Sequence, residues 1–172
     1  MIMNKLMQFF MESYSLEHTK RYSMKPVIAQ ESVATHSFFV ALGTMLLSEI
    51  YEFDVDKAVK VALCHDLAEM EISDVNHVVK KLYPDVAMAL KMAEEKIVGS
   101  FPDSVRDHCH DYHDKSTPEA LVVHYADAMQ CLQYAENEIK LGNLGYMVDV
   151  KKNSIIRMEF LTEQLKPYVK RK

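Results

Sequence analysis

Residue types that bind divalent metals occur at three separated places in the chain. They are His36, the adjacent pair His65 and Asp66, and Asp127, and each lies in a stretch otherwise rich in apolar residues. Imidazole nitrogen and carboxylate oxygen together suit zinc, cobalt or manganese better than calcium, which prefers oxygen ligands alone. A metal with open positions can make hydroxide from water and stabilise charge on a phosphate oxygen. If these segments pack together, the pattern predicts a divalent-metal site able to hydrolyse a phosphate compound.

Each of these residues also has a purely structural interpretation. A histidine on an apolar helix is often a hydrogen-bonded core residue, a His-Asp dipeptide is common, and Asp127 could be a cap or an ion-pair residue. Their joint occurrence on apolar segments favours the metal. A buried carboxylate without a partner costs on the order of several kcal/mol, and a cation compensates that cost.

The segments that carry these residues are predicted to be helices. Only four glycines and five prolines occur in 172 residues, and no segment alternates apolar and polar residues as a half-exposed strand does. We therefore predict an all-α fold, with the apolar segment at 32–51 buried. Helices are expected over 4–14, 32–51, 54–71 (or from 56), 73–82, 85–98, 102–112, 118–141 and 148–165.

Composition limits the classes of partner. The formal net charge of −5 predicts no nucleic-acid or anionic-membrane partner, although a local basic pocket remains compatible with it. Three scattered cysteines without a CxxC pair are typical of reduced thiols in the cytoplasm. No signal peptide and no apolar run of about 18 residues is found. We expect one cytoplasmic domain over residues 1–172.

Four short motifs occur within about residues 21–140, namely Ser32-Val-Ala-Thr-His36-Ser37, His65-Asp66-Leu-Ala-Glu69, Ser73-Asp74 and Tyr125-Ala-Asp127-Ala128. Together they resemble the motifs of the HD-domain phosphohydrolases. The resemblance is to the bacterial 5′-deoxynucleotidases and their short phage relatives, which include dATP triphosphohydrolases. It implies a single HD-type helical bundle in which His36, His65, Asp66 and Asp127 bind one divalent metal (Zn, Co or Mn).

The resemblance implies a catalytic role for two acidic residues of these motifs. It implies that Glu69, with Asp74, orients or activates the attacking water, a role that suits a carboxylate beside a metal-bound water. Glu69 follows Asp66 by three residues and would face the same site if the helix continues. The structural alternatives are a solvated Glu69 and a helix N-cap at Asp74.

The segment Arg21-Tyr22-Ser23-Met24 is the next point of resemblance. The deoxynucleotidases carry Arg-Trp at the same spacing before the first histidine, and the phage enzymes carry Arg-Trp-Ser-Ile. The resemblance implies that Arg21 clamps a phosphate, Tyr22 packs on the sugar and excludes a 2′-hydroxyl, and Met24 shapes the base pocket. A surface arginine and a core tyrosine are the alternative. Tyr22 in place of Trp, and Thr35 in place of the usual Glu, depart from the family pattern.

Four further histidines, His108, His110, His113 and His124, could hold a second metal. His113 is the best candidate, but we expect most of this group to lie in loops or at the surface. Lys80 and Lys81 could meet phosphates, although exposed lysines are usually only solvated.

We therefore expect a metal-dependent phosphohydrolase acting on a small-molecule 2′-deoxynucleotide. A monophosphatase that releases phosphate and a triphosphohydrolase that releases triphosphate, with dATP favoured, remain equally open. The alternative is a non-catalytic helical nucleotide-binding or scaffold domain, whereas a cyclic-nucleotide phosphodiesterase fits poorly. The resemblance also implies a homo-oligomer, a dimer or hexamer, located in the host cytoplasm if the chain is phage-encoded.

Overall fold

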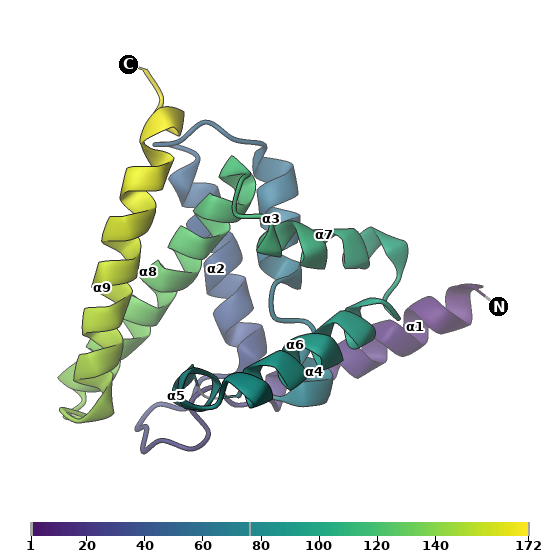
Figure 1. Cartoon of the computed structure of the whole chain (residues 1–172), viewed down its shortest axis with the longest axis horizontal. Coiled ribbons are helices and arrows are strands. Elements are labelled where there is room, and N and C mark those ends of the chain that lie inside the picture. Colours follow the sequence, from purple (N-terminus) through teal and green to yellow (C-terminus); the bar gives the residue numbers. More distant parts are fainter. Residues whose placement is uncertain (1, 76, 172) are drawn as a thin grey trace.

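The computed structural model describes residues 2–75 and 77–171, and in these ranges it is helical, with two isolated β-bridges and no strand (Figure 1). The all-α prediction is confirmed. Short 3₁₀ helices follow α1 and α9, at Tyr14–Glu17 and Lys166–Tyr168. The α-helices are α1 (Ile2–Ser13), α2 (Val33–Leu47), α3 (Val55–Cys64), α4 (Glu69–Ile72), α5 (His77–Leu82), α6 (Pro84–Val98), α7 (Asp103–His113), α8 (Pro118–Lys140) and α9 (Tyr146–Leu165).

The longest helix, α8, is the centre of the packing. It lies beside α9 along most of its length and also packs against α2 and α3 (Figure 1). Its small side chains permit close approach: an added Cβ at Gly43 of α2 would lie 3.5 Å from the Ala126 Cβ. The shared core is aliphatic and is formed mainly by Val40, Ala41, Val61, Ala62, Val122, Val123, Ala126, Leu161 and Leu165.

Side-chain caps fix the starts of the helices that carry the motifs. The Ser32 hydroxyl accepts the Thr35 backbone N–H at 3.1 Å before α2, and the Asp54 carboxylate accepts that of Lys57 at 3.0 Å before α3. The Thr117 hydroxyl does the same for α8. Each cap satisfies a backbone donor that has no partner within its helix. The helix starts predicted near residues 32, 54 and 118 are therefore confirmed to within one residue.

The continuous helix predicted over 54–71 is wrong. α3 ends at Cys64, residues 65–68 form turns, and α4 begins at Glu69. Backbone hydrogen bonds from residues 67, 69 and 70 reach back only three residues, so the chain is wound more tightly here than in an α-helix. This change of winding sets the directions of His65 and Asp66 at the end of α3.

Two further predictions need correction. The helix expected over 73–82 begins only at His77, because Ser73 has a left-handed φ of 63° that ends α4. The segment 32–51 is not buried throughout: α2 ends at Leu47 and leaves one face exposed, including Phe38 and Leu46.

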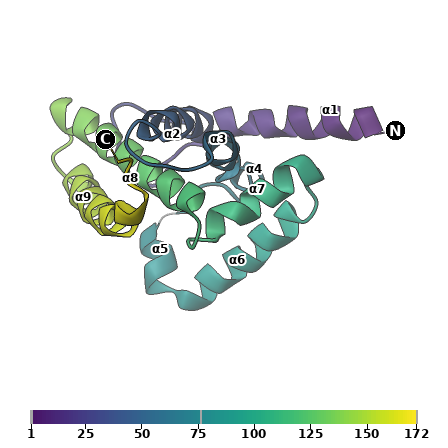
Figure 2. The ribbon, with the colours of Figure 1, turned by 90° about the horizontal axis from the view of Figure 1, so that it is seen from above.

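α1 projects from the body of the molecule (Figure 2). It buries none of its residues, although the Phe9 ring packs edge-on against Phe101 at 5.0 Å. None of the helices formed by the described residues has the length and apolar character needed to cross a membrane.

Candidate metal centre and pocket

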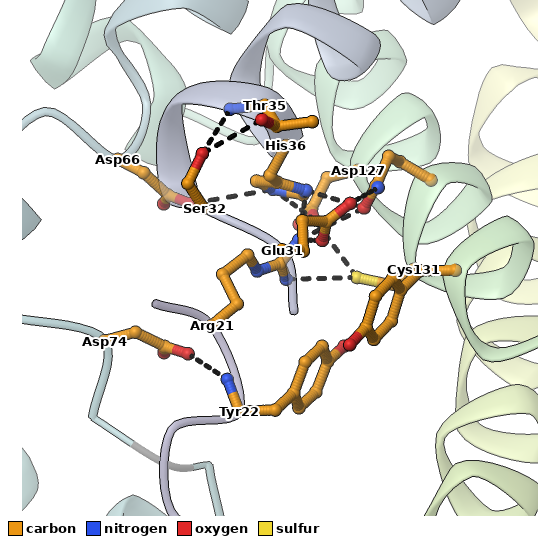
Figure 3. A network of polar contacts seen from close by, with 12 residues as sticks. Arg21, Tyr22, Glu31, Ser32, Thr35, His36, Asp66, Asp74, Asp127 and Cys131 are labelled. Atoms are coloured by element: carbon orange, nitrogen blue, oxygen red, sulfur yellow. Dashed lines mark hydrogen bonds and ion pairs between the residues drawn. The ribbon is translucent and has the colours of Figure 1, made fainter. Parts of the chain in front are cut away.

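Four side chains predicted to be metal ligands converge where α2, the end of α3 and α8 meet, and Figure 3 shows three of them, His36, Asp66 and Asp127. Ligand atoms of His36, His65 and Asp127 all lie within 4.8 Å of one another. The Asp66 Oδ2 lies 3.2 Å from the His65 Nε2 and 3.6 Å from the His36 Nε2. His36, His65 and Asp127 are buried, while Asp66 faces the adjoining pocket. Residues separated by up to 91 positions thus form one compact cluster, which is the condition that the predicted metal site required.

The second nitrogen of each imidazole, Nδ1, already has a hydrogen-bond partner in the protein. The Nδ1 of His36 lies 2.6 Å from the Gln130 Oε1, and the Nδ1 of His65 lies 2.7 Å from the Ala62 carbonyl oxygen. Because the Ala62 carbonyl is an acceptor, the Nδ1 of His65 carries a proton, and its Nε2 lone pair turns toward the cluster once the second ring proton is lost. The Nδ1 of His36 faces a nitrogen of Arg21 as well as the Gln130 oxygen, and its Nε2 also points toward the cluster. Outer partners of this kind orient histidines that bind metals.

The cluster therefore consists of groups that need a cation between them. The Nε2 atoms of His36 and His65 are only 3.3 Å apart, and the carboxylates of Asp66 and Asp127 face the same point. Two nitrogen lone pairs and two carboxylates repel one another unless a proton or a metal ion lies among them. The mixed nitrogen and oxygen donor set fits a divalent transition metal or zinc.

The charges of the cluster are those a metal site requires. Despite burial, which opposes ionisation, the pKa values of Asp66 and Asp127 lie below their usual range, chiefly because of His65 and Arg157 respectively. Burial lowers the pKa of His65, but the Asp66 carboxylate overcomes it and raises this pKa to about 9. Both carboxylates are thus ionised at neutral pH, and a bound dication would displace the His65 proton.

Two donors hold the outer oxygen of Asp127. Arg157 of α9 lies 2.8 Å from Oδ2, and the Tyr112 hydroxyl donates to the same atom at 3.3 Å. The other oxygen, Oδ1, lies 3.4 Å from the His36 Nε2. Asp127 is consequently fixed with one oxygen turned toward the cluster.

A pocket of about 600 Å³ opens beside the cluster. It is large enough for a nucleotide-sized ligand. Seven of the residues predicted for the site line it, and His36 and His65 lie behind its wall. The seven lining residues are Arg21, Tyr22, Met24, Asp66, Glu69, Asp74 and Asp127.

The Arg21 side chain is buried more deeply in the protein than a residue that binds a phosphate in the pocket needs to be. Its guanidinium donates to Glu31 at 3.4 Å, to Gln130 at 3.1 Å and to Cys131 at 3.3 Å, and it also contacts the His36 ring (Figure 3). The side chain is only 13% exposed. Arg21 thus supplies positive charge behind the cluster, and its predicted contact with a phosphate stays a prediction.

Tyr22 forms an aromatic wall of the pocket. Its ring stacks on Tyr134 with centroids 5.2 Å apart and planes inclined by 2°, and Tyr146 approaches edge-on. The residue has a left-handed φ of 55°, and its backbone N–H donates to the Asp74 carboxylate at 3.1 Å (Figure 3). Asp74 therefore secures this loop, and Met24 lies at the exposed margin of the pocket.

Glu69 faces the pocket even though the helix expected to carry it is broken. Burial, followed by repulsion from Asp66 and Asp74, raises the pKa of Glu69 to about 9. A carboxyl group with a raised pKa is a stronger base once it is ionised. A nearby cation would lower the pKa of Glu69 back toward neutrality. The geometry thus suits proton transfer at this position.

Sequence reasoning did not single out the residues that support the ligands. Gln130 hydrogen-bonds to His36, Glu31 accepts from the Gln130 amide, and Tyr112 and Arg157 hold Asp127. Glu31 directly precedes the motif Ser32-Val-Ala-Thr-His36-Ser37, so a signal existed for it. Gln130 follows Asp127 by three residues on one helix face, which is a weaker signal. Nothing in the sequence pointed to Tyr112 or Arg157.

The additional histidines do not join the cluster. His108, His110 and His113 lie within α7 rather than in a loop, and His113 pairs with Glu94 at 3.3 Å. His124 is buried on α8, where its Nε2 lies 3.0 Å from the Tyr112 carbonyl oxygen. Among the described residues, the group of ligand atoms close enough for a metal includes none of the four.

Comparison with known proteins places the chain in a family. The model of the HD domain matches residues 14–164. A 5′-deoxynucleotidase of Klebsiella pneumoniae is 26% identical over 153 residues, which cover 81% of this chain and 77% of the relative. A conserved hypothetical protein from Pyrococcus furiosus superposes with a TM-score of 0.77 at 26% identity, covering 94% of this chain and 97% of the other.

A more distant structural neighbour carries both a metal and a nucleoside. It is the HD phosphohydrolase DatZ of cyanophage S-2L, bound to dA and one catalytic Zn²⁺ ion, with a TM-score of 0.59 and 16% identity over 89% of this chain and 95% of the other. At this identity the likeness concerns the fold alone.

The chain belongs to the HD-domain family, because the family model covers most of its length. It is an HD-domain phosphohydrolase related to the 5′-deoxynucleotidases, and its buried His-His-Asp group is a candidate site for the metal on which such enzymes depend. That the residues outside 14–164 belong to the same domain stays a prediction.

Proposed function

We propose that this chain hydrolyses 2′-deoxynucleotides at the phosphate joined to the sugar, with a divalent metal held by His36, His65, Asp66 and Asp127. The observation that carries the proposal is the convergence of these four ligands at a pocket that also contains cationic and aromatic side chains. The metal, Zn, Co or Mn, would supply a hydroxide equivalent and neutralise charge on the phosphoryl oxygens.

In the proposed reaction, water adds to phosphorus and the bond between phosphorus and the 5′ oxygen breaks. Glu69, whose pKa is raised by burial and neighbouring acids, accepts the proton of the attacking water. The departing 5′ oxygen takes up a proton from solvent and Glu69 releases its proton to solvent, so the products are a deoxynucleoside and a free phosphate. Asp74 holds the Tyr22 backbone, and this contact fixes the pocket wall during the reaction.

The sugar preference is proposed to come from Tyr22. Its ring is immobilised between Tyr134 and Tyr146, so a ribose 2′-hydroxyl would meet a rigid aromatic surface without a hydrogen-bond partner. Met24, at the margin of the pocket, would contact the base. The relatedness to 5′-deoxynucleotidases supports this choice of substrate and favours a monophosphate.

A triphosphate is the second candidate substrate. Lys80 and Lys81 of α5 line the same pocket as the metal cluster, and two additional cations suit a longer phosphate chain. On a triphosphate the same bond cleavage would release the deoxynucleoside and triphosphate.

The test is a product analysis by anion-exchange chromatography. The protein with Co²⁺, Mn²⁺ or Zn²⁺ is offered dAMP, dATP and AMP, beside the Asp66→Ala variant as control. Phosphate released from dAMP but not from AMP supports the deoxynucleotidase, and deoxyadenosine with triphosphate from dATP supports the triphosphohydrolase. If no metal gives turnover that Asp66→Ala abolishes, the enzyme proposal fails and a non-catalytic nucleotide-binding domain replaces it.

We also propose that the chain works as a cytoplasmic homo-oligomer. The side chains that leave large apolar surface exposed on α1 and α2 support this, since a monomer rarely exposes so many together. Light scattering tests this by comparing the particle mass of the natural protein with that of Phe38→Glu, which should be smaller. A natural protein with the mass of a monomer would contradict the proposal. The exposed side chains include Met3, Met7, Phe10 and Met11 on α1 and Phe38, Leu42, Met45 and Leu46 on α2.

A further inference from the structure

Arg157 is a cation of the pocket that no motif contains. It lies on α9, it lines the pocket beside Asp127, and its side chain is 40% exposed. Its Nη1 lies 2.8 Å from the Asp127 Oδ2, and its Nη2 lies 3.1 Å from the His124 Nδ1. Within the described residues, these contacts use two of the five N–H donors of a guanidinium, and the Tyr112 hydroxyl lies close to the same group, so further donors remain for a ligand.

His124 fixes the position of this guanidinium. The His124 Nε2 faces the Tyr112 carbonyl oxygen at 3.0 Å, an acceptor, so the ring proton lies on Nε2. The Nδ1 is then the lone-pair nitrogen and accepts from Arg157. Arg157 is thus held at two points, by an imidazole on one side and a carboxylate on the other, before any substrate enters. Such preorganisation lowers the cost of binding a charged group.

Arg21 differs from Arg157 in the donors it has left. Both terminal nitrogens of Arg21 already face protein partners, namely Glu31, Gln130 and Cys131, and only 13% of the side chain is exposed. Arg157 has three times that exposure and lies directly beside a proposed ligand. A phosphate that reaches the cluster therefore meets the free donors of Arg157 more readily than those of Arg21.

We propose that Arg157 is a catalytic residue that binds the phosphoryl group undergoing hydrolysis. The inference rests on the proposed function, since it requires a deoxynucleotide phosphate in this pocket. Arg157 donates its remaining N–H groups to phosphoryl oxygens, and its charge stabilises the negative charge that these oxygens develop during hydrolysis. Arg21 then provides the positive charge behind the cluster, while Arg157 provides the direct contact.

The experiment compares ligands that differ only in the phosphate. Binding of deoxyadenosine and dAMP to the Asp66→Asn background, which prevents turnover, and binding of Co²⁺ to the protein with Asp66 intact are measured by calorimetry with and without Arg157→Gln. We expect Arg157→Gln to weaken dAMP binding about 10- to 100-fold, the value of a charge-assisted contact, and to leave deoxyadenosine binding unchanged. With Asp66 intact, kcat/KM for the nucleotide should fall about 100-fold.

Two variants serve as controls. Arg157→Lys keeps the charge without the planar fork and should recover part of the dAMP affinity. Lys151→Gln removes another cation of α9, one that pairs with Glu136 of α8 at 3.0 Å outside the pocket, and it should change neither ligand's affinity. Thermal unfolding of each variant shows whether the helix pair remains intact.

The outcomes separate the two proposals. Equal losses of dAMP and deoxyadenosine affinity, or an unchanged dAMP affinity, would overturn the phosphate contact. A lower Co²⁺ affinity with unchanged dAMP binding would also overturn it, because Arg157 would then only position Asp127. If the intact protein turns over no nucleotide but Arg157→Gln still weakens dAMP alone, the hydrolase proposal fails while the phosphate contact stands.

Discussion

The ligand cluster and the outer wall of the pocket are built in different ways. The cluster joins α2, the end of α3 and α8, and its side chains are fixed by buried partners such as Gln130 and the Ala62 carbonyl. The outer wall comes from the loop near Met24, from α4 and from the six-residue α5. There the side chains are more exposed, and Met24, Lys80 and Lys81 reach solvent.

This difference assigns different tasks to the two regions. Where outer partners hold His36, His65 and Asp127, the removal of one group leaves the others buried, charged and misdirected, so function should fail sharply. Where cations are exposed, water and salt screen them, so each adds little and substitution should change preference gradually. The inner cluster would then determine whether the chemistry occurs, and the outer wall which substrate is chosen.

The largest effect is expected inside the cluster, from His36→Gln. It removes a ligand that is fully buried and leaves Asp66 and Asp127 facing each other across the gap. We expect Co²⁺ binding to be lost and turnover to fall by about 10⁴-fold or more. Calorimetric titration with Co²⁺ and the product assay measure both. His110→Gln, at an exposed position of α7, is the matched control, and retention of activity by His36→Gln would contradict the inner site.

The next effect is expected where the two regions meet, at Glu69. Glu69→Gln keeps the shape of the side chain but cannot accept a proton, so kcat should fall about 10²- to 10³-fold while Co²⁺ affinity changes little. Rates measured at saturating metal and substrate test this. A change in KM alone would instead assign Glu69 to substrate binding.

The raised pKa of Glu69 also leads us to expect that the free energy of unfolding depends on pH when the metal is removed by a chelator. The folded-state pKa of Glu69 is about 9, above its ordinary value, so the folded protein holds a proton that the unfolded chain releases. The stabilisation is complete below about pH 4.5 and is lost as the pH rises through 9, by at most about 1.4 kcal/mol per pH unit. Urea unfolding from pH 5 to 9 should therefore show a steeper decline for the natural protein than for Glu69→Gln. Parallel curves would contradict the raised pKa.

A smaller effect is expected from Gln130→Ala, which removes the acceptor behind His36. The ring would lose the hydrogen bond that turns its Nε2 toward the cluster, so Co²⁺ affinity should fall about 10- to 100-fold with turnover retained at saturating metal. Calorimetry at several Co²⁺ concentrations separates affinity from rate. Gln130→Glu keeps an acceptor and should recover much of the affinity, whereas an unaltered affinity in Gln130→Ala would show that the packing of α2 and α8 alone orients His36.

The contrast between the two regions also explains how much the sequence could predict. The helices with clear caps could be predicted from residue spacing, and the proposed ligands that they bring together could be predicted from the family pattern. The packing of apolar helix faces constrains both the helices and the positions of these ligands. The turns at residues 65–68, which end α3, could not be predicted. They depend on backbone hydrogen bonds that reach back three residues instead of four, and on the His65 ring, which hydrogen-bonds to the Ala62 carbonyl oxygen. Arg157 was not predictable because its role depends on how α9 lies along α8, and an arginine on an amphipathic helix has no distinctive pattern.

The smallest effect is expected at the outer wall, from Lys80→Ala combined with Lys81→Ala. Both side chains line the pocket on a short helix, and both are exposed, so solvent screens their charge. If they meet the distal part of a phosphate chain, KM for dATP should rise about two- to fivefold, KM for dAMP should hardly change, and the difference should vanish in high salt. Steady-state rates at two ionic strengths measure this, with Lys91→Ala on α6 as the exposed control. An equal change for both nucleotides would mean that the outer wall attracts anions in general, and the choice between one phosphate and three would then have to lie nearer the cluster.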